Sequence, residues 1–197
     1  PVKTVTSGEG GAITTNSFSI AKKMRALRSH SMERKKSMFP WEYKMNELGF
    51  NYRINDFQCA LGISQLKRLD KFVKKRQELV THYNRLLSDA LPFIETRGKE
   101  TNWGEIAPHL YSVLIDFKSA KTNRQTVVSN LKKNGIGTQV HYIPIHTQPY
   151  YKNLYGKLKL VGAKEYYKKT LSLPLFPQMK VKDVQFVVRS LKKVLKI

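Results

Sequence analysis

The C-terminal segment has the most regular pattern of hydrophobic positions in the chain. Apolar residues recur there at the spacing of one helix face, at Val184, Val187, Val188, Leu191, Val194 and Leu195. We interpret this stripe as a helix that packs its apolar face on a core, and not as a ligand site. Two further helices are predicted near the start of the chain. Asn16 is placed to cap a helix over Ser19–Leu27, and Asn55 with Gln58 forms a capping-box pattern ahead of a longer apolar stripe.

The second half of the chain has the pattern of a strand, a helix and a second strand. Hydrophobic alternation predicts a strand over residues 110–115. Thr122 and Gln125 form a capping-box pattern, and the Asn-Gly pair at 134–135 is typical of a helix end. Residues 137–140 are predicted to return as a strand.

Two shorter segments complete this prediction. Ala12–Thr15 has the composition of a short strand, and Leu173–Pro177, with its two prolines, is interpreted as a turn.

Composition limits the function classes. A single cysteine, Cys59, excludes an internal disulfide and is typical of a protein of the reducing cytoplasm. No apolar run approaches the length of a membrane span. The 36 Lys and Arg against 14 Asp and Glu give a formal charge of +22, which suits nucleic acid or an anionic membrane surface. The lysines are spread along the chain as helix-face pairs, however, and no nucleic-acid-binding motif is present, so we expect neither partner.

The start of the chain carries the first candidate for chemistry. Lys3 precedes the run Ser7-Gly8-Glu9-Gly10-Gly11, whose glycines allow close approach of the backbone to a ligand. A lysine amine becomes a nucleophile toward carbonyls when its surroundings lower its pKa. Spacing alone fits a solvated surface lysine followed by an ordinary turn equally well.

Asn51-Tyr52-Arg53 is the second candidate, because an amide and a guanidinium two positions apart suit anion binding. The alternative is that Arg53 only pairs with Glu47 or Asp56.

His141-Tyr142-Ile143-Pro144-Ile145-His146 is the third candidate. Two histidines suggest a metal, but neither a cysteine nor a third ligand accompanies them, so we expect no metal site. A packed tyrosine and a hydrogen-bonded histidine remain the alternative to a binding role.

Several separated strings, in order, resemble sugar aminotransferases of the DegT/DnrJ/EryC1/StrS family. These strings are Lys3-x-x-x-Ser7-Gly8-Glu9-Gly10-Gly11, Leu48-Gly49-Phe50-Asn51-Tyr52-Arg53-Ile54-Asn55-Asp56, Gly135-Ile136-Gly137-Thr138-Gln139-Val140-His141-Tyr142 and Ser172-Leu173-Pro174-Leu175. The resemblance implies an α/β fold of the PLP-dependent aspartate-aminotransferase type (type I). Family members are longer and have the lysine near their middle, so the chain resembles their C-terminal half. We expect residues 1–75 to end the large PLP-binding domain and residues 76–197 to form the small α/β domain.

The resemblance also implies roles for single residues. Lys3 would be catalytic and carry pyridoxal 5'-phosphate (PLP) as a Schiff base. Asn51 would reach across a homodimer to the PLP phosphate of the other subunit, and Arg53 would bind the carboxylate of the amino donor. The residues expected to line the sugar-nucleotide pocket are Gln139, Val140, His141 and Tyr142.

The implied function is PLP-dependent transamination of a nucleotide-linked, UDP-type 4-keto-6-deoxy sugar with a donor such as glutamate. The string at 137–142 is most similar to family members that act in pseudaminic acid synthesis. Relatives that carry His in place of the lysine act as dehydrases, so Lys3 favours transamination. We expect the 197-residue chain to be inactive alone, since the remaining cofactor contacts of the family lie outside it. The alternative function is a catalytically inactive, strongly basic fragment that binds anions.

Overall fold

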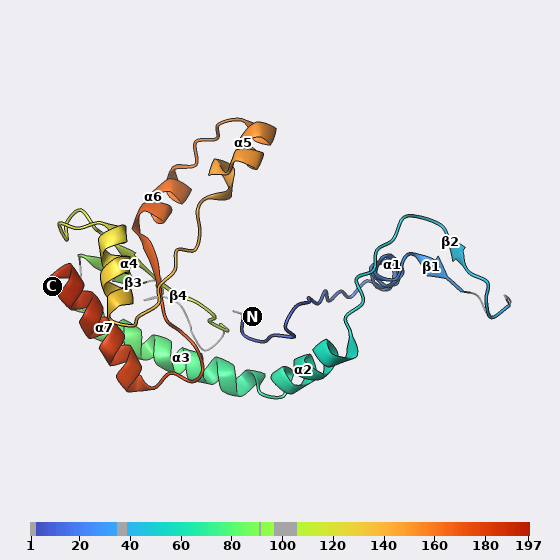
Figure 1. Ribbon diagram of the computed structural model, residues 1–197, viewed down its shortest axis with the longest axis horizontal. Helices are drawn as coiled ribbons and strands as arrows, with labels where there is room; N and C mark the ends of the chain where they lie inside the picture. The colour runs from blue at the N-terminus through green and yellow to red at the C-terminus, as the bar shows by residue number, and fades with distance from the viewer. Residues whose placement is uncertain (1–2, 35–38, 91, 97–105) are drawn as a thin grey trace. The chain divides into compact units, whose positions relative to one another are not determined.

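The computed structural model describes residues 3–34, 39–90, 92–96 and 106–197 and divides the chain into two compact units, Pro1–Arg68 and Leu69–Ile197 (Figure 1). The second unit begins with helix α3 (Leu69–Leu86), so the boundary expected near residue 75 lies inside that helix. The role of each unit as a domain of a larger enzyme stays a prediction.

In the residues of the first unit that the structure describes, there are two helices and one short β-ladder. Its elements are α1 (Phe18–Arg28), β1 (Met32–Glu33), β2 (Lys44–Met45) and α2 (Asp56–Leu66), and β1 pairs with β2 in antiparallel fashion. Asn55 and Gln58 form the predicted capping box of α2. The cap of α1 was predicted wrongly, because Ser17 and not Asn16 accepts the hydrogen bond from the backbone of Ile20.

The strand predicted at Ala12–Thr15 is also wrong. This segment is exposed and has no strand partner in the part of the chain that the structure describes. An isolated extended segment gains no ladder hydrogen bonds, so composition alone does not make it a strand.

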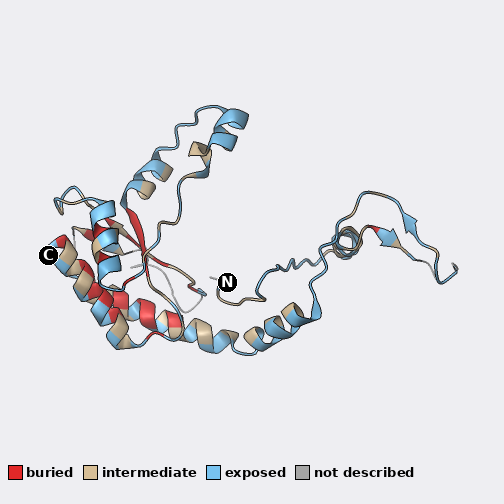
Figure 2. Cartoon of the chain, in the orientation of Figure 1, coloured by how far each residue is buried: buried red, intermediate tan, exposed pale blue. Residues whose placement is uncertain are grey.

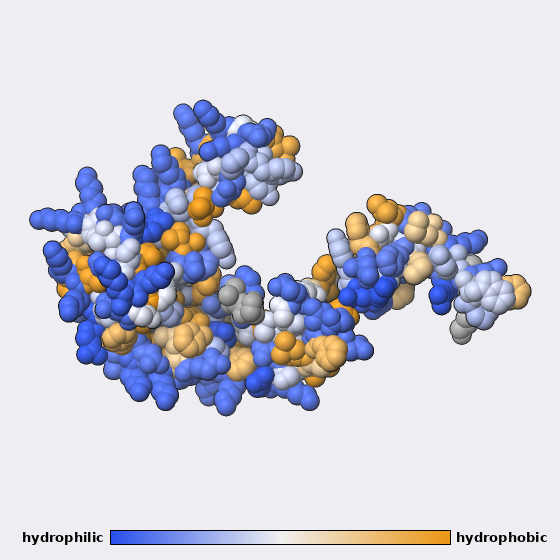
Figure 3. All heavy atoms as spheres, viewed as in Figure 1, coloured by the Kyte–Doolittle hydropathy of each residue, from blue (hydrophilic) through white to orange (hydrophobic). Residues whose placement is uncertain are grey.

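The first unit buries little of its apolar surface. None of the residues of α1 or α2, all of which are described, is buried (Figure 2). Phe18 is 78% exposed, Leu48 77% and Phe57 89%. Apolar residues lie among polar ones on the visible surface in Figure 3. Such exposed large apolar side chains are typical of a surface that another polypeptide segment covers.

The second unit is built on a three-stranded antiparallel sheet. The strand order is β3 (Ile94–Thr96), β4 (Tyr111–Ile115) and β5 (Thr170–Leu173), with Val113 opposite Leu171. Helix α7 (Val181–Leu195) packs against both α3 and α4 (Arg124–Lys133). Between α4 and β5 the chain forms a 3₁₀ turn at Ile145–Thr147, α5 (Pro149–Tyr155) and α6 (Val161–Lys169).

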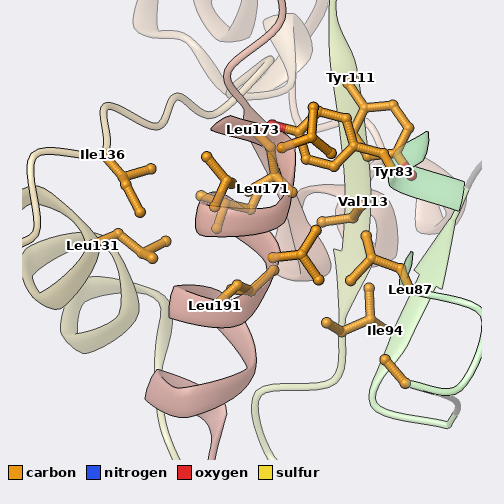
Figure 4. Packing of buried hydrophobic residues seen from close by; sticks show 14 of the residues in the cluster. Tyr83, Leu87, Ile94, Tyr111, Val113, Leu131, Ile136, Leu171, Leu173 and Leu191 are labelled. Atoms are coloured by element: carbon orange, nitrogen blue, oxygen red, sulfur yellow. The ribbon is translucent and has the colours of Figure 1, made fainter. Parts of the chain in front are cut away.

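The core of the second unit confirms the predicted C-terminal helix. Leu191 of α7 points into the same interior as Leu131 of α4, Val113 of β4 and Leu171 of β5, and all four are completely buried (Figure 4). Two tyrosines close one end of this core. The rings of Tyr83 and Tyr111 stack with their centroids 4.5 Å apart.

The predicted strand at 110–115 and the helix end at Asn134-Gly135 are confirmed, with Gly135 at φ 74°. Asn123, and not Thr122, caps α4 through its bond to the backbone of Thr126.

The strand predicted at residues 137–140 is reduced to one antiparallel bridge between Gln139 and Ser172. Strand β4 pairs instead with β3 and β5. Leu173, the last residue of β5, is also the first residue of the segment interpreted as a turn. All four residues of β5 are buried. Its sequence, Thr-Leu-Ser-Leu, does alternate polar and apolar residues, but it is only four residues long, and the two prolines that follow it favoured a turn.

Candidate active site

Lys3 begins a loop that is shaped by short-range hydrogen bonds and glycines. The backbone of Gly8 donates to Thr6 Oγ1 at 3.0 Å, and Ser7 Oγ donates to the carbonyl of Glu9 at 2.9 Å. Gly8 at φ 84° and Gly10 at φ 139° adopt backbone angles that side chains disfavour. Lys3 itself is exposed. The loop therefore holds a fixed backbone turn next to an accessible lysine.

This loop packs on the segment that leads into α2. A Cβ on Gly10 would lie 3.3 Å from Ile54 Cδ1 and 3.0 Å from Ser7 Oγ. A Cβ on Gly62 of α2 would lie 3.9 Å from Ser7 Cβ. The structure thus brings the Lys3 loop to Ile54, the residue that follows Arg53.

Backbone hydrogen bonds hold the segment around Asn51 at the C-terminal end of α1. Phe50 N donates to the carbonyl of Leu27 at 2.7 Å, and Tyr52 N donates to the carbonyl of Arg28 at 2.9 Å. These bonds pair orphan carbonyls of the last helical turn, which need partners outside the helix. The backbone of Asn51 is therefore placed by α1.

The side chains of Asn51 and Arg53 are exposed on this segment. Glu47 pairs with Lys23, and within the described ranges neither Glu47 nor Asp56 forms an ion pair with Arg53. The alternative interpretation of Arg53 as the partner of one of these two acids is therefore not supported. An amide and a guanidinium at this surface are hydrogen-bond donors that suit a phosphate or a carboxylate.

His30 and Ser31 have left-handed backbone angles, φ 60° and φ 50°. A Cβ on Gly49 would lie 2.2 Å from Ser31 N and 2.4 Å from the carbonyl carbon of His30. Only glycine permits this approach of the two backbones. Gly49 lies in the string Leu48–Asp56 that resembles the family, but its residue type alone did not reveal this packing role.

The third candidate segment lies in the second unit, on the edge of β5. Gln139 and Ser172 exchange both backbone hydrogen bonds, with N···O distances of 3.2 and 2.8 Å. Gln139 is exposed, whereas Val140 and His141 are half-buried. His141 Nδ1 lies 2.8 Å from Ser172 Oγ, so the alternative of a hydrogen-bonded histidine holds for this ring nitrogen.

Tyr142 is 63% exposed and lines a pocket of about 410 Å³, together with Ile143, Pro144, Ile145, Gln148, Ala163 and Tyr166. Gln139, Val140 and His141 are not among the lining residues. The structure thus places one of the four expected pocket residues in a pocket. It places these four in the second unit and Lys3, Asn51 and Arg53 in the first.

Ser172 was not singled out from the sequence as a site residue, although it contacts both Gln139 and His141. It lies in β5 and is 3% exposed, with its Oγ 2.7 Å from Ser112 Oγ. A serine inside an otherwise apolar run was the available signal, because a buried hydroxyl requires a hydrogen-bond partner.

Across the described residues, no three His, Cys, Asp or Glu side chains gather into a possible metal site. In the same ranges, every helix is too short or too polar to cross a membrane.

A model of the DegT/DnrJ/EryC1/StrS aminotransferase family matches residues 1–192. The chain is 37% identical over 187 residues to the UDP-4-amino-4,6-dideoxy-N-acetyl-beta-L-altrosamine transaminase of Campylobacter jejuni subsp. jejuni serotype O:23/36 (strain 81-176). The aligned region covers 95% of this chain and 48% of the relative. The chain is also 36% identical over 206 residues to the spore coat polysaccharide biosynthesis protein SpsC of Bacillus subtilis (strain 168), covering 98% of this chain and 51% of the relative. The chain thus spans about half the length of these relatives.

The fold also matches a solved structure. Helicobacter pylori PseC, an aminotransferase involved in the biosynthesis of pseudoaminic acid, superposes with a TM-score of 0.87 at 32% identity, covering 98% of this chain and 51% of that chain. This match confirms the expected α/β aminotransferase fold.

Proposed function

The chain belongs to the DegT/DnrJ/EryC1/StrS aminotransferase family, and on that basis we propose that it forms part of a PLP-dependent sugar aminotransferase. The proposed substrate is a UDP-linked 4-keto-6-deoxy sugar, the donor is glutamate, and the enzyme is a cytoplasmic homodimer. The similarity to a UDP-sugar transaminase of Campylobacter jejuni supports the substrate class.

The residues of the first unit fit PLP. Lys3 offers a primary amine on an exposed loop, which suits covalent attachment to an aldehyde. The exposed amide of Asn51 suits a phosphate. A side chain at Gly10 would crowd Ser7 and Ile54, so this glycine lets the loop pack closely on the segment that leads into α2. When bound, PLP supplies an electron sink for carbanion chemistry.

The chain's own residues have separate roles in the proposed reaction. Lys3 Nζ takes the proton from the α-carbon of the amino donor and returns it at the next stage, as a tethered general base and acid. Arg53 orients the donor by gripping its carboxylate with two parallel hydrogen bonds. Asn51 of one subunit binds the phosphate in the site of the partner. The nucleotide sugar is held by the segment Gln139–Tyr142.

One observation carries this proposal. The Lys3 loop lies against Ile54, directly after the segment that presents Asn51 and Arg53. The loop that begins at Lys3 therefore contacts, within the first unit, the segment that carries the Asn51 amide and the Arg53 guanidinium. That combination of groups is what a phosphate-bearing aldehyde and an amino acid require.

The test is to locate the cofactor chemically in the polypeptide expressed from the whole open reading frame. After incubation with PLP, borohydride reduction and proteolysis, mass spectrometry should find a phosphopyridoxyl group on Lys3. The Lys3→Ala and Lys3→Arg variants should lack it and have no measurable turnover of the keto-sugar, because a guanidinium does not replace the amine. Lys193→Ala, at an exposed position of α7, is the matched control and should leave labelling and turnover unchanged.

A phosphopyridoxyl label on a different lysine would contradict the assignment of Lys3 as the attachment point. A protein that takes up no PLP and binds phosphate and nucleotides indiscriminately would instead support the basic anion-binding fragment.

A further inference from the structure

Ser172 touches the expected substrate segment at three points. Its backbone exchanges two hydrogen bonds with Gln139, and its hydroxyl lies 2.8 Å from His141 Nδ1. The residue is 3% exposed, so its hydroxyl has little access to water. The strand β5 thus fixes both the backbone of the segment and the ring of His141 through one residue.

A second serine supports this contact from the neighbouring strand. Ser112 of β4 stands opposite Ser172 in the register of the sheet, and the two Oγ atoms are 2.7 Å apart. A hydroxyl has one hydrogen to donate and accepts through its lone pairs. When Ser112 donates to Ser172, the Ser172 hydrogen is directed to Nδ1 of a neutral imidazole. When Nδ1 carries a proton, the two bonds reverse, and Ser172 accepts from His141 and donates to Ser112.

The orientation of His141 also affects Tyr142. Their rings meet edge to face, with centroids 4.6 Å apart and an interplanar angle of 80°. A rotation of the imidazole about its side-chain bonds would remove this contact. The ring held by Ser172 is therefore part of the support of Tyr142, which lines the pocket of the second unit.

We propose that Ser172, backed by Ser112, is a positioning residue that sets the orientation of the His141 ring for recognition of the nucleotide sugar. Ser172 acts through His141 and does not itself contact the substrate. This inference rests on the proposed function, in which the segment Gln139–Tyr142 binds the nucleotide sugar.

The kinetic test is a double-mutant cycle in the polypeptide expressed from the whole open reading frame. Ser172→Ala removes the hydroxyl but keeps both backbone bonds to Gln139. We expect KM for the UDP-sugar to rise about tenfold, the effect of one lost hydrogen bond, while kcat stays within about twofold. In a His141→Gln background the same change should alter KM by less than about twofold, because residues that act through one contact are not additive.

Thr170→Val is the matched control. Thr170 lies in the same strand and is completely buried, and the described residues give its hydroxyl no hydrogen-bond partner. Its removal should leave KM unchanged. Ser172→Cys, which keeps a small side chain but is a weak donor, serves as a second variant and should raise KM as Ser172→Ala does.

NMR spectroscopy tests whether Ser172 contacts His141 without requiring a measurement of turnover. In protein with isotope-labelled histidine, NMR should show the ring nitrogens of His141 shifted by Ser172→Ala and not by Thr170→Val, with His141→Gln identifying the signal. Unchanged nitrogen shifts would overturn the proposal, as would equal KM effects of Ser172→Ala in both backgrounds. A wild-type protein without UDP-sugar turnover would remove the proposed function, while the nitrogen shifts would still decide whether Ser172 positions His141.

Discussion

Gly49 passes so close to Ser31 that a Cβ on the glycine would lie 2.2 Å from the backbone nitrogen of the serine. This approach joins the end of α1 to the segment that carries Asn51. Backbone atoms do not yield as a flexible side-chain tip does, so any side chain at Gly49 must separate the two segments.

Gly49→Ala should destabilise the first unit by about 3 kcal/mol, the upper range for an overpacked site. Hydrogen exchange should show faster exchange of the Phe50 amide, which donates to the carbonyl of Leu27. Gly11→Ala is the matched control, since a Cβ there meets nothing within 4 Å. Equal exchange in the two variants would show that the close approach has no energetic role.

Ser31→Gly should stabilise the first unit by about 1 kcal/mol, because a left-handed angle costs a residue with a Cβ about that much. Ser31 has φ 50°, and its buried Oγ has no hydrogen-bond partner in the described part of the chain. Urea denaturation measures the gain. Ser31→Ala removes the hydroxyl but keeps the unfavourable angle, so a gain of the same size in that variant would assign the effect to the hydroxyl instead.

The stability of the second unit should fall as the pH rises above about 10, the usual tyrosine pKa. Burial raises the pKa of both Tyr83 and Tyr111 above this value. The unfolded chain therefore releases these protons first, and it is favoured progressively at higher pH. Below the usual pKa both states keep the protons, and the contribution is constant.

Urea midpoints at pH values below and above this range measure the effect. The combined Tyr83→Phe and Tyr111→Phe variant should be less stable at neutral pH, because the hydroxyls donate to the carbonyl of Pro174 and to Asn84 Oδ1. Its loss of stability in alkali should be smaller than that of the wild type. Tyr150→Phe, at a 70% exposed position, should leave the wild-type dependence intact.

Asn51 is proposed to act in the site of the partner subunit, which predicts complementation between two inactive variants. Mixing Asn51→Ala subunits with Lys3→Ala subunits after reversible dissociation should restore activity, with one competent site in each mixed dimer. Turnover of the UDP-sugar is the measurement. Mixing two preparations of the same variant is the control, and absence of recovery in the true mixture would contradict a shared site.

The sequence predicted best those elements whose signal is local. The apolar stripe of α7 and the capping box of Asn55 and Gln58 are confirmed, because each pattern reflects a periodicity or contact within one helix. The cap of α1 was placed one residue too early because several neighbouring polar residues can serve as caps. Asn16 and Ser17 are both favourable capping residues, so residue type does not decide between them.

Features that depend on contacts between distant parts of the sequence were harder to predict. Strand β5 alternates polar and apolar residues over only four positions and is followed directly by Pro174, so the prolines outweighed its short strand pattern, and its partner β4 lies far away in the sequence. The role of Ser172 depends on those same distant contacts. By contrast, the family could be identified from separated strings, since their shared order carries information that single spacings lack.

The position of β5 also determines when the second unit can fold during synthesis. Ser112 and Ser172 are paired in the sheet but are 60 positions apart in the chain. At a translation rate of about 5–20 residues per second, β4 waits several seconds for its partner. During that interval its unpaired edge is open to other strands. Binding by a chaperone before β5 and α7 emerge would therefore protect the nascent chain from aggregation.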